Sequence, residues 1–248
     1  MKKEMIFSLI LVPLLVVSSC VKSGKESTES SISGINQNET IEIDGSNVQG
    51  NYSADIWPVN YNLHITSIGK VGVKREGDSL SASVQLSHGP KETTVKQAIY
   101  TARRCPNLND DLNKDAYIDI LEARIAIGKI TIPFDSDLDT QSEGKDQYPT
   151  VDATGKMSYY QTASFSRLFE DLKDIDLDLA DDIMKLGADE GITFPGRIVL
   201  FQGMPTKIPL PPSVGTIEGE DKYKSIPIGC AILWKVEEMP TELSAGGY

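Results

Sequence analysis

The stretch of the chain with the clearest chemistry is residues 111–122, Asp-Leu-Asn-Lys-Asp-Ala-Tyr-Ile-Asp-Ile-Leu-Glu. Ca²⁺ is a hard cation that takes about six to eight oxygen ligands, and closely spaced oxygen donors in a tight loop can surround it. Tyr117 would contribute its backbone carbonyl and Glu122 both of its carboxylate oxygens. The spacing therefore predicts that calcium is the cofactor and that its ligands are Asp111, Asn113, Asp115, Tyr117, Asp119 and Glu122.

This spacing is that of an EF-hand calcium loop, with two departures from the usual pattern. Ala116 stands where glycine normally makes the sharp turn, and a residue with a Cβ costs about 1 kcal/mol in a left-handed conformation. Pro106 and the polar stretch after it do not fit a helix before the loop, so we expect only the helix after it, over 120–127. Ile118 is expected to point into the fold. The alternative interpretation is a solvated acidic turn that caps the helix at Ile120.

Two further acidic segments are candidates for cation binding. Asp135, Asp137 and Asp139 alternate along the chain, which suggests a weak additional calcium contact. A second, denser run could form another cation site, but runs of charge are usually solvated, and we expect a solvated face around two short helices. That run consists of Asp171, Asp174, Asp176, Asp178, Asp181 and Asp182.

The N-terminus has the pattern of an export signal. Lys2 and Lys3 precede an apolar run over 6–17 that is too short to span a bilayer. The run ends in Val17-Ser18-Ser19-Cys20, which resembles the lipobox of bacterial lipoproteins. We therefore expect 1–19 to be a lipoprotein signal peptide and Cys20 to carry the lipid; the alternative is an ordinary secretory signal. Either signal places the mature chain outside the cytoplasm, and the lipid would anchor it in the bacterial cell envelope, at the outer membrane or in the periplasm.

Composition divides the remaining chain into three parts. Residues 20–55 are rich in Ser, Glu, Gly and Asn, which predicts a flexible tether. Residues 56–240 can form one folded domain, and 241–248 is expected to be a tail. With Cys20 lipidated, Cys105 and Cys230 most simply form one disulfide in an exported domain; the alternative is two free buried thiols.

The balance of charge restricts the partners. The formal net charge is −12, and nucleic acids and anionic lipid surfaces require clustered Lys and Arg. Nucleic acid is therefore excluded as a partner. The expected partners are the membrane, through the N-terminal lipid, and a protein or surface ligand.

The hydrophobic pattern predicts a mainly β fold. Short segments with period-two alternation are separated by Gly, Pro and Asn turns, which is typical of a β-sandwich. One or two short helices are expected, the second starting with Ser166 as its N-cap and continuing in a turn around 179–186. The predicted strands are 61–65, 71–73, 80–86, 95–100, 130–133, 157–165, 197–201 and 226–236.

Three stretches resemble, in the same order, segments of one known family. The first places Arg104-Cys105-Pro106 just before the acidic loop. The second, Gly196-Arg197-Ile198-Val199-Leu200-Phe201, is similar to a strand that ends in a copper-binding His. The third is Ile226-Pro227-Ile228-Gly229-Cys230-Ala231-Ile232, which looks like the closing strand whose Cys joins the disulfide. The family is a bacterial secreted one related to Cu,Zn superoxide dismutase and to CHRD domains. The resemblance covers about residues 60–236, implies an eight-stranded Greek-key sandwich, and supports pairing of Cys105 with Cys230.

The chain departs from this family at the metal-binding histidines. A Gln-His-Ile-His-like strand in the family corresponds here to Gln97-Ala98-Ile99-Tyr100, and Gln202 stands where another His would be needed. Copper and zinc need imidazoles at such a site, and His64 and His88 are the only histidines in the sequence. His64 is expected to be a partly buried strand residue and His88 a turn residue.

No residue pattern indicates a catalytic site. The sequence contains no Gly-x-Ser-x-Gly elbow, and the carboxylates of an acidic chain are too common to identify a glycosidase pair. We therefore expect a lipid-anchored, calcium-binding extracytoplasmic domain without catalytic activity, with a structural or partner-binding role. The alternative is a divergent superoxide dismutase-like or hydrolytic enzyme in which calcium is structural.

Overall fold

The structure is a computed structural model that describes residues 48–138, 147–173, 183–187 and 191–238. The predicted signal peptide 1–19, Cys20, the tether up to residue 47 and the predicted tail 241–248 lie outside the described residues. None of the helices in the described part of the chain has the length and apolar character needed to cross a bilayer.

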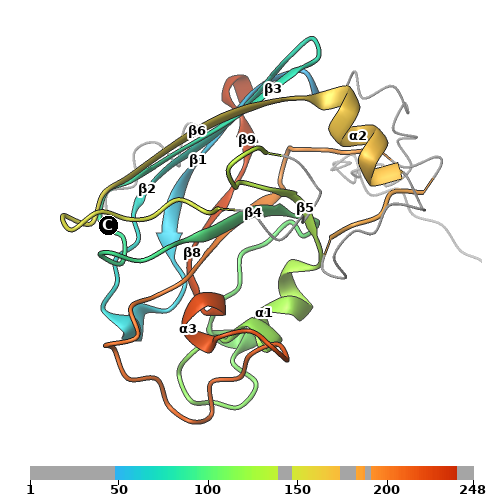
Figure 1. Cartoon of the computed structure of the whole chain (residues 1–248). Helices are drawn as coiled ribbons and strands as arrows, with labels where there is room; N and C mark the ends of the chain where they lie inside the picture. The colour runs from blue at the N-terminus through green and yellow to red at the C-terminus, as the bar shows by residue number, and fades with distance from the viewer. Residues whose placement is uncertain (1–47, 139–146, 174–182, 188–190, 239–248) are drawn as a thin grey trace, which may run out of the picture. The chain divides into compact units, whose positions relative to one another are not determined.

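The described residues form a mainly β fold around one antiparallel sheet that curls on itself (Figure 1). The order along the sheet is β5-β4-β7-β8-β1-β2-β3-β6, and the short β9 pairs with β1. The strands are β1 (Gly50–Pro58), β2 (Gly69–Glu76), β3 (Ser79–Leu86), β4 (Lys96–Tyr100), β5 (Ile130–Pro133), β6 (Met157–Ser164), β7 (Ile198–Gln202), β8 (Pro227–Ile232) and β9 (Trp234–Lys235).

The helices are short and lie at the ends of the sheet. They are α1 (Ile120–Ile127), α2 (Phe165–Lys173) and α3 (Lys222–Ser225), with 3-10 turns at η2 (Tyr61–Leu63), η3 (Leu108–Asp110) and η4 (Val236–Glu238). Figure 1 shows α1 and α3 at one end of the sheet and α2 at the other. The acidic loop 111–122 therefore lies at the end that carries α1.

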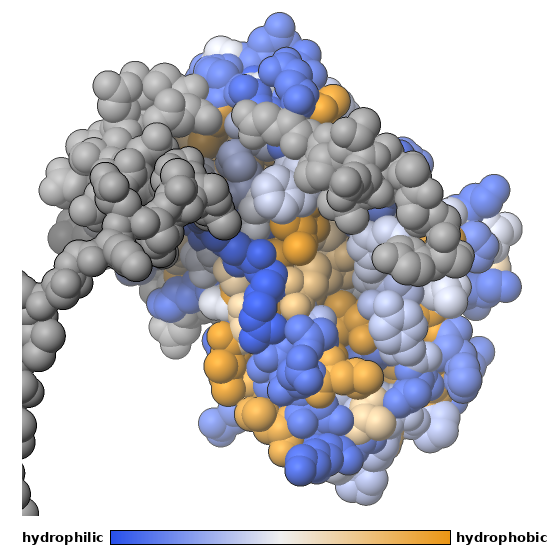
Figure 2. Space-filling view, turned by 180° about the vertical axis from the view of Figure 1, so that it is seen from behind, coloured by the Kyte–Doolittle hydropathy of each residue, from blue (hydrophilic) through white to orange (hydrophobic). Residues whose placement is uncertain are grey.

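The core fills the inside of the curled sheet. β1, β2, β3 and β6 alternate buried and exposed side chains, whereas β4, β5, β7 and β8 are buried almost throughout. Val71 and Val73 of β2 and Leu80 of β3 are almost fully buried, whereas their sequence neighbours are partly or fully exposed. Aromatic rings also pack in the core, where Tyr52 contacts Phe194 edge to face with 5.4 Å between the ring centroids. Apolar residues also reach the surface, where Figure 2 shows them as patches between hydrophilic residues.

Most predicted strands are confirmed, but the folded part begins earlier than Ile56. Strand β1 begins at Gly50, and Val48 is already buried. Tyr52, Ala54 and Ile56 alternate inward between polar residues, so the polar composition of this stretch concealed a strand.

Four local predictions are wrong. The stretch 61–65 is not a strand, because the chain turns through η2 and ends at His64, which is exposed and has a φ of 52°. Helix α2 begins at Phe165 rather than after Ser166. Of the helical turn predicted around 179–186, residues 179–182 lie outside the described residues, and 183–186 are not helical, because Ile183 instead forms a parallel bridge with Ile130. The predicted strand 226–236 is also divided into β8, β9 and η4.

The disulfide between Cys105 and Cys230 is present, with the two Cα atoms 5.8 Å apart. It joins the segment before the acidic loop to β8 across a sequence separation of 125 residues. A link that closes so long a loop removes many conformations from the unfolded chain. The sequence interpretation of these two cysteines is confirmed.

Removing this bond should lower stability more than any single surface substitution. Replacing both cysteines, as Cys105→Ser with Cys230→Ser, should lower the free energy of unfolding by up to about 5 kcal/mol. The measurement is denaturant unfolding of both proteins with and without reductant. The wild type should lose stability in reductant and the double variant should not respond; a wild type that is indifferent to reductant contradicts the prediction.

Candidate functional site

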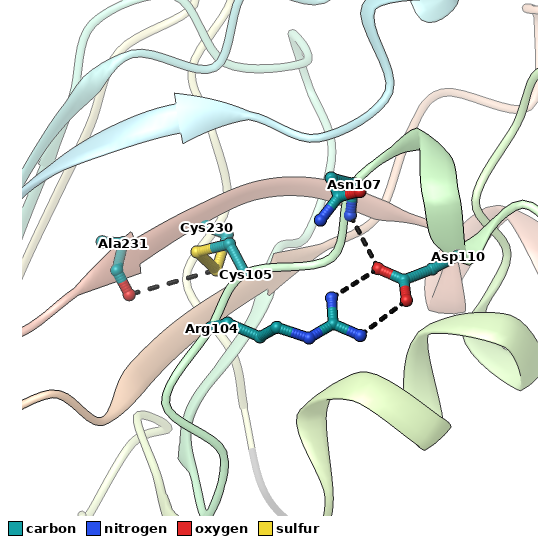
Figure 3. The surroundings of a disulfide bond; sticks show 6 residues. All are labelled: Arg104, Cys105, Asn107, Asp110, Cys230 and Ala231. Carbon is teal, nitrogen blue, oxygen red and sulfur yellow. Dashed lines mark hydrogen bonds and ion pairs between the residues drawn. A yellow bond between two sulfur atoms is a disulfide. The ribbon is translucent and has the colours of Figure 1, made fainter.

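The segment that leads into the acidic loop is held rigidly beside the disulfide (Figure 3). The guanidinium of Arg104 donates two hydrogen bonds to the carboxylate of Asp110, each 2.7 Å long. The same carboxylate accepts the backbone N–H of Asn107 at 2.9 Å. A bidentate Arg–carboxylate pair fixes geometry as well as charge, and it holds the pKa of Asp110 below its usual range. Asp111, the first residue of the loop, therefore directly follows a residue whose side chain is held by three hydrogen bonds.

The first half of the loop turns tightly around its own side chains. Lys114 and Ala116 both have left-handed backbones, with φ of 58° and 68°. The carboxylate of Asp111 accepts the N–H groups of Asp115 and Ala116, at 3.2 and 2.9 Å. The side-chain carbonyl of Asn113 also accepts the N–H of Asp115, at 2.9 Å. The sharp turn that glycine makes in such loops is therefore formed here by alanine.

The second half of the loop merges with the start of α1. Asp119 is the N-cap and accepts the N–H groups of Leu121 and Glu122, while Glu122 accepts the N–H of Asp119. This reciprocal arrangement is a capping box. The other carboxylate oxygen of Glu122 accepts the N–H groups of Leu112 and Asn113, at 2.9 and 3.1 Å. Glu122 thus links the end of the loop to its beginning.

Residues far away in the sequence hold the loop against the sheet. The buried side chain of Asn60 donates to the carbonyls of Ile118 and Pro227 and accepts the N–H of Ile118. The second carboxylate oxygen of Asp119 accepts the N–H of Gly215 at 2.6 Å. Ile118 is fully buried, as predicted from its position in the loop. Asn60 and Gly215 belong to no recognisable motif, and nothing in the sequence marks them as loop contacts.

The chemistry of this loop fits calcium. Asp111, Asp115, Asp119 and Glu122 are four carboxylates within twelve residues, and none forms an ion pair within the described part of the chain. One oxygen of Asp115 is buried without a hydrogen-bond partner, and an unpaired buried oxygen is costly unless a cation or water meets it. The set of oxygen donors is the kind that hard cations prefer.

The carboxylates do not converge on one point in this conformation. Among the described residues, no three His, Cys, Asp or Glu side chains are grouped so as to hold a metal ion. Most of the loop oxygens instead accept backbone N–H groups of the loop. Asp119 and Glu122 cap α1, as the alternative interpretation expects, but both side chains are buried rather than solvated, and their role as calcium ligands remains a prediction.

The other acidic segments are only partly described. Asp139 and residues Asp174 to Asp182 of the dense run lie outside the described residues. Asp137 and Asp171 line one pocket of about 420 Å³, and one oxygen of Asp171 is buried without a partner. Asp171 and Asp137 are therefore brought together, although they are far apart in the sequence.

The carboxyl group of Asp135 combines burial with a raised pKa. It is 1% exposed, and one of its oxygens accepts the N–H of Leu138 while the other has no partner. Burial, together with the adjacent Asp137 carboxyl, raises the pKa of Asp135 to about 7. Burial and the two carboxylates also raise the pKa of Tyr159, whose ring stacks on Phe134.

The positions that the resemblance assigns to metal-binding histidines contain Ala98, Tyr100 and Gln202. The hydroxyl of Tyr100 on β4 donates to the side-chain carbonyl of Gln202 on β7 at 3.2 Å, in a buried position. The amide of Gln202 donates in turn to the carbonyl of Ser225. His64 and His88 are both exposed, and His88 lies in a bend after β3. An amide and a phenol are not the imidazoles that copper and zinc require at such a site.

Comparison of the chain with models of protein families and with curated proteins gave no match. The class of the protein therefore has to be argued from the fold and from the loop itself.

The positive φ of Ala116 predicts that glycine at this position increases the stability of the protein. Ala116→Gly should stabilise the protein by about 1 kcal/mol, because glycine adopts a positive φ without the steric cost of a Cβ. Ala126→Gly in α1 is the matched control, and the same substitution within a helix should destabilise by about 1 kcal/mol. Urea unfolding of the three proteins measures both, and a destabilised Ala116→Gly variant would show that the turn differs from the one described.

The raised pKa of Asp135 predicts the direction of a pH effect. Its folded carboxyl holds a proton more tightly than the unfolded one, so the folded state binds more protons between about pH 4 and pH 7. The free energy of unfolding should therefore fall as the pH rises through this range, by up to about 4 kcal/mol from this group.

Asp135→Asn should remove that part of the pH dependence and raise stability at pH 8 relative to the wild type. Asp152→Asn is the control with the opposite sign, because hydrogen bonds within its turn lower the pKa of Asp152. Unfolding at several pH values measures both, and an unchanged pH profile for Asp135→Asn counts against the assignment.

Proposed function

We propose that this protein is a calcium-binding extracytoplasmic domain without catalytic activity, held at the bacterial cell envelope by a lipid on Cys20. The observation that supports this best is the 111–122 loop, in which an oxygen-rich sequence adopts the tight left-handed turn at Ala116. The buried, unpartnered oxygen of Asp115 adds to that support. Within this proposal the domain has a structural or partner-binding role.

Calcium would act on this loop by neutralising its carboxylates. Asp111, Asn113 and Asp115 lie in the first half of the loop, and Asp119 and Glu122 lie at the start of α1. A shared cation would tie these halves together, adding to or replacing the N–H groups that the carboxylates now accept. The disulfide holds one end of the loop, so the effect is a more stable folded state by mass action.

We also propose that the curled sheet is a Greek-key sandwich of the superoxide dismutase type. The support is the connectivity, because β1, β2 and β3 are neighbours in order, whereas the chain crosses to the other end of the sheet from β3 to β4. The stretch 196–201, which resembles a strand of that family, forms most of β7, and Cys230 lies on β8. The strand that carries Gln97 pairs with β7, where the resemblance expects ligands from both strands.

We also propose that the domain has no catalytic activity, because of the residue types at the positions where the resemblance expects metal ligands. Tyr100 and Gln202 occupy two of the positions where the resemblance expects imidazoles, and they already satisfy one another by a hydrogen bond. A dismutase built on these strands would lack the ligands for its metals.

Calcium should raise the melting temperature of the wild-type protein relative to EDTA. At a calcium concentration about 100 times the Kd, the gain in free energy is about 2.7 kcal/mol, which corresponds to roughly 5 to 10 °C for a domain of this size. Differential scanning calorimetry in millimolar calcium and in EDTA measures this shift. Equal melting temperatures in the two buffers would contradict the proposal.

Two conservative substitutions separate calcium binding from helix capping. Asn and Gln keep one side-chain oxygen as an acceptor for the start of α1, but their NH2 group replaces an oxygen that accepts a backbone N–H, such as that of Gly215 at Asp119. Asp119→Asn and Glu122→Gln should therefore melt below the wild type in EDTA, and the comparison that matters is each variant's own shift between EDTA and calcium. They should lose the shift with calcium, because the ligand charge is gone. Asp221→Asn at the N-cap of α3 is the control and should keep the full shift. If all three variants keep it, the calcium site lies elsewhere.

A further inference from the structure

The sheet opens into a groove where β1 extends beyond its last pair with β2. Up to Ile56, β1 pairs with β2, where Ile56 lies opposite Gly69. On its other edge β1 pairs with β8, where Trp57 lies opposite Cys230. Ile68 meanwhile stays beside β3, because its carbonyl accepts the N–H of Ser87 at 2.9 Å. The strands therefore separate, and a groove of about 800 Å³ opens between Trp57 and the ends of β2, β3 and β6.

A row of hydrogen-bonding side chains crosses the floor of this groove. The strand register places Asp55, Lys70, Gln85 and Ser158 opposite one another on β1, β2, β3 and β6. All four side chains are exposed, and the amide of Gln85 donates to the hydroxyl of Ser158 at 2.7 Å. At about 4.8 Å per strand the row is roughly 14 Å long. That length suits a short linear ligand rather than a single small molecule.

An aromatic ring flanks this polar row. Trp57 is two residues beyond Asp55 on the same face and is 53% exposed, although an indole is usually buried. Its backbone is paired with Cys230, so the ring is presented by a strand that the disulfide holds. Tyr160 is also exposed on this face, because it lies opposite Ser83, two residues from Gln85. The polar row is therefore bordered by exposed aromatic rings.

The groove is close to neutral, whereas the chain has a formal charge of −12. Its lining contains two carboxylates and two ammonium groups, from Asp55, Asp152, Lys70 and Lys156. Asp55 and Lys70 form an ion pair at 3.7 Å, and the carboxylate of Asp152 accepts N–H groups within its own turn. No excess charge remains to select an ionic ligand.

We propose that this groove binds a neutral oligosaccharide. A sugar ring has an apolar C–H face and a hydroxyl edge, so the face would stack on the indole of Trp57 and the hydroxyls would pair with the row that contains Gln85 and Ser158. An apolar peptide would use Trp57 and Ile68 but would cover the polar row without pairing it, which is costly. The groove shares no lining residue with the 111–122 loop, so the proposal is independent of calcium.

The test is titration calorimetry of the wild-type protein against neutral oligosaccharides of two to four glucose or N-acetylglucosamine units, in calcium and in EDTA. We expect binding of at least one series in both buffers. Trp57→Ala should weaken it about tenfold or more, because a central aromatic anchor is lost. Trp57→Phe should retain part of the affinity. Trp234→Ala, which removes the other tryptophan outside the groove, should leave binding unchanged.

Several results would overturn the proposal. One is no binding of any oligosaccharide at millimolar concentration by the folded wild type. Another is binding that survives Trp57→Ala, in a variant whose melting temperature shows that it is folded. A third is a groove that takes only an uncharged apolar peptide in a Trp57-dependent way. Sugar binding that disappears only in EDTA would also count against it, because it would place the ligand at the calcium loop.

Discussion

The structure depends on one junction, where the Cys105–Cys230 bond and the side chain of Asn60 fasten the acidic loop to β8. The covalent bond holds the segment that leads into the loop, and Asn60 holds Ile118 near its end. Both attach to the same part of the sheet. Because an acidic loop repels itself, it needs such external fastening to stay compact in the absence of a cation.

The loop itself combines two roles in one set of carboxylates. Asp119 and Glu122 satisfy the free N–H groups at the start of α1, a task that needs acceptors and no metal. Asp111 and Asp115 do the same for a tight turn. A loop that is already ordered loses less entropy when it binds an ion. The same hydrogen bonds that make the loop stable on its own would therefore favour calcium binding, provided that the oxygens retain free lone pairs.

Part of the sheet was predictable because its strands follow one local rule, whereas β7 and β8 are continuous buried runs that do not alternate. β3 alternates inward Leu80, Ala82 and Val84 with outward serines, and this period is visible in the sequence. The stretch 61–65 shows the same alternation and is not a strand, since Tyr61 is exposed and the chain there follows the turn at η2. Alternation reports which side chains could be buried together, but it does not report whether a neighbouring strand is present.

The candidate ligands in the loop could be predicted from the sequence, but the residues that hold the loop in place could not. The spacing of the acidic residues is local, so it can be read from twelve consecutive positions. The contacts of Asn60 and Gly215 join positions about 60 and 100 residues apart, and they depend on how the whole sheet closes. The same is true of the bridge between Ile130 and Ile183, which replaced a predicted helix. Non-local pairing decides such segments against their local propensity.

The place of β1 in the sheet has a mechanical consequence. The strand runs from Gly50 to Pro58 between β2 and β8, and the chain N-terminal to it is the part proposed to reach the membrane. Tension between that anchor and anything held at Trp57 would run along this one strand. Because both points of attachment lie on β1, the covalent backbone of the strand would carry this tension, and the hydrogen bonds to β2 and β8 would not be loaded. A ligand held at Trp57 could therefore be pulled against the anchor without unpairing the sheet.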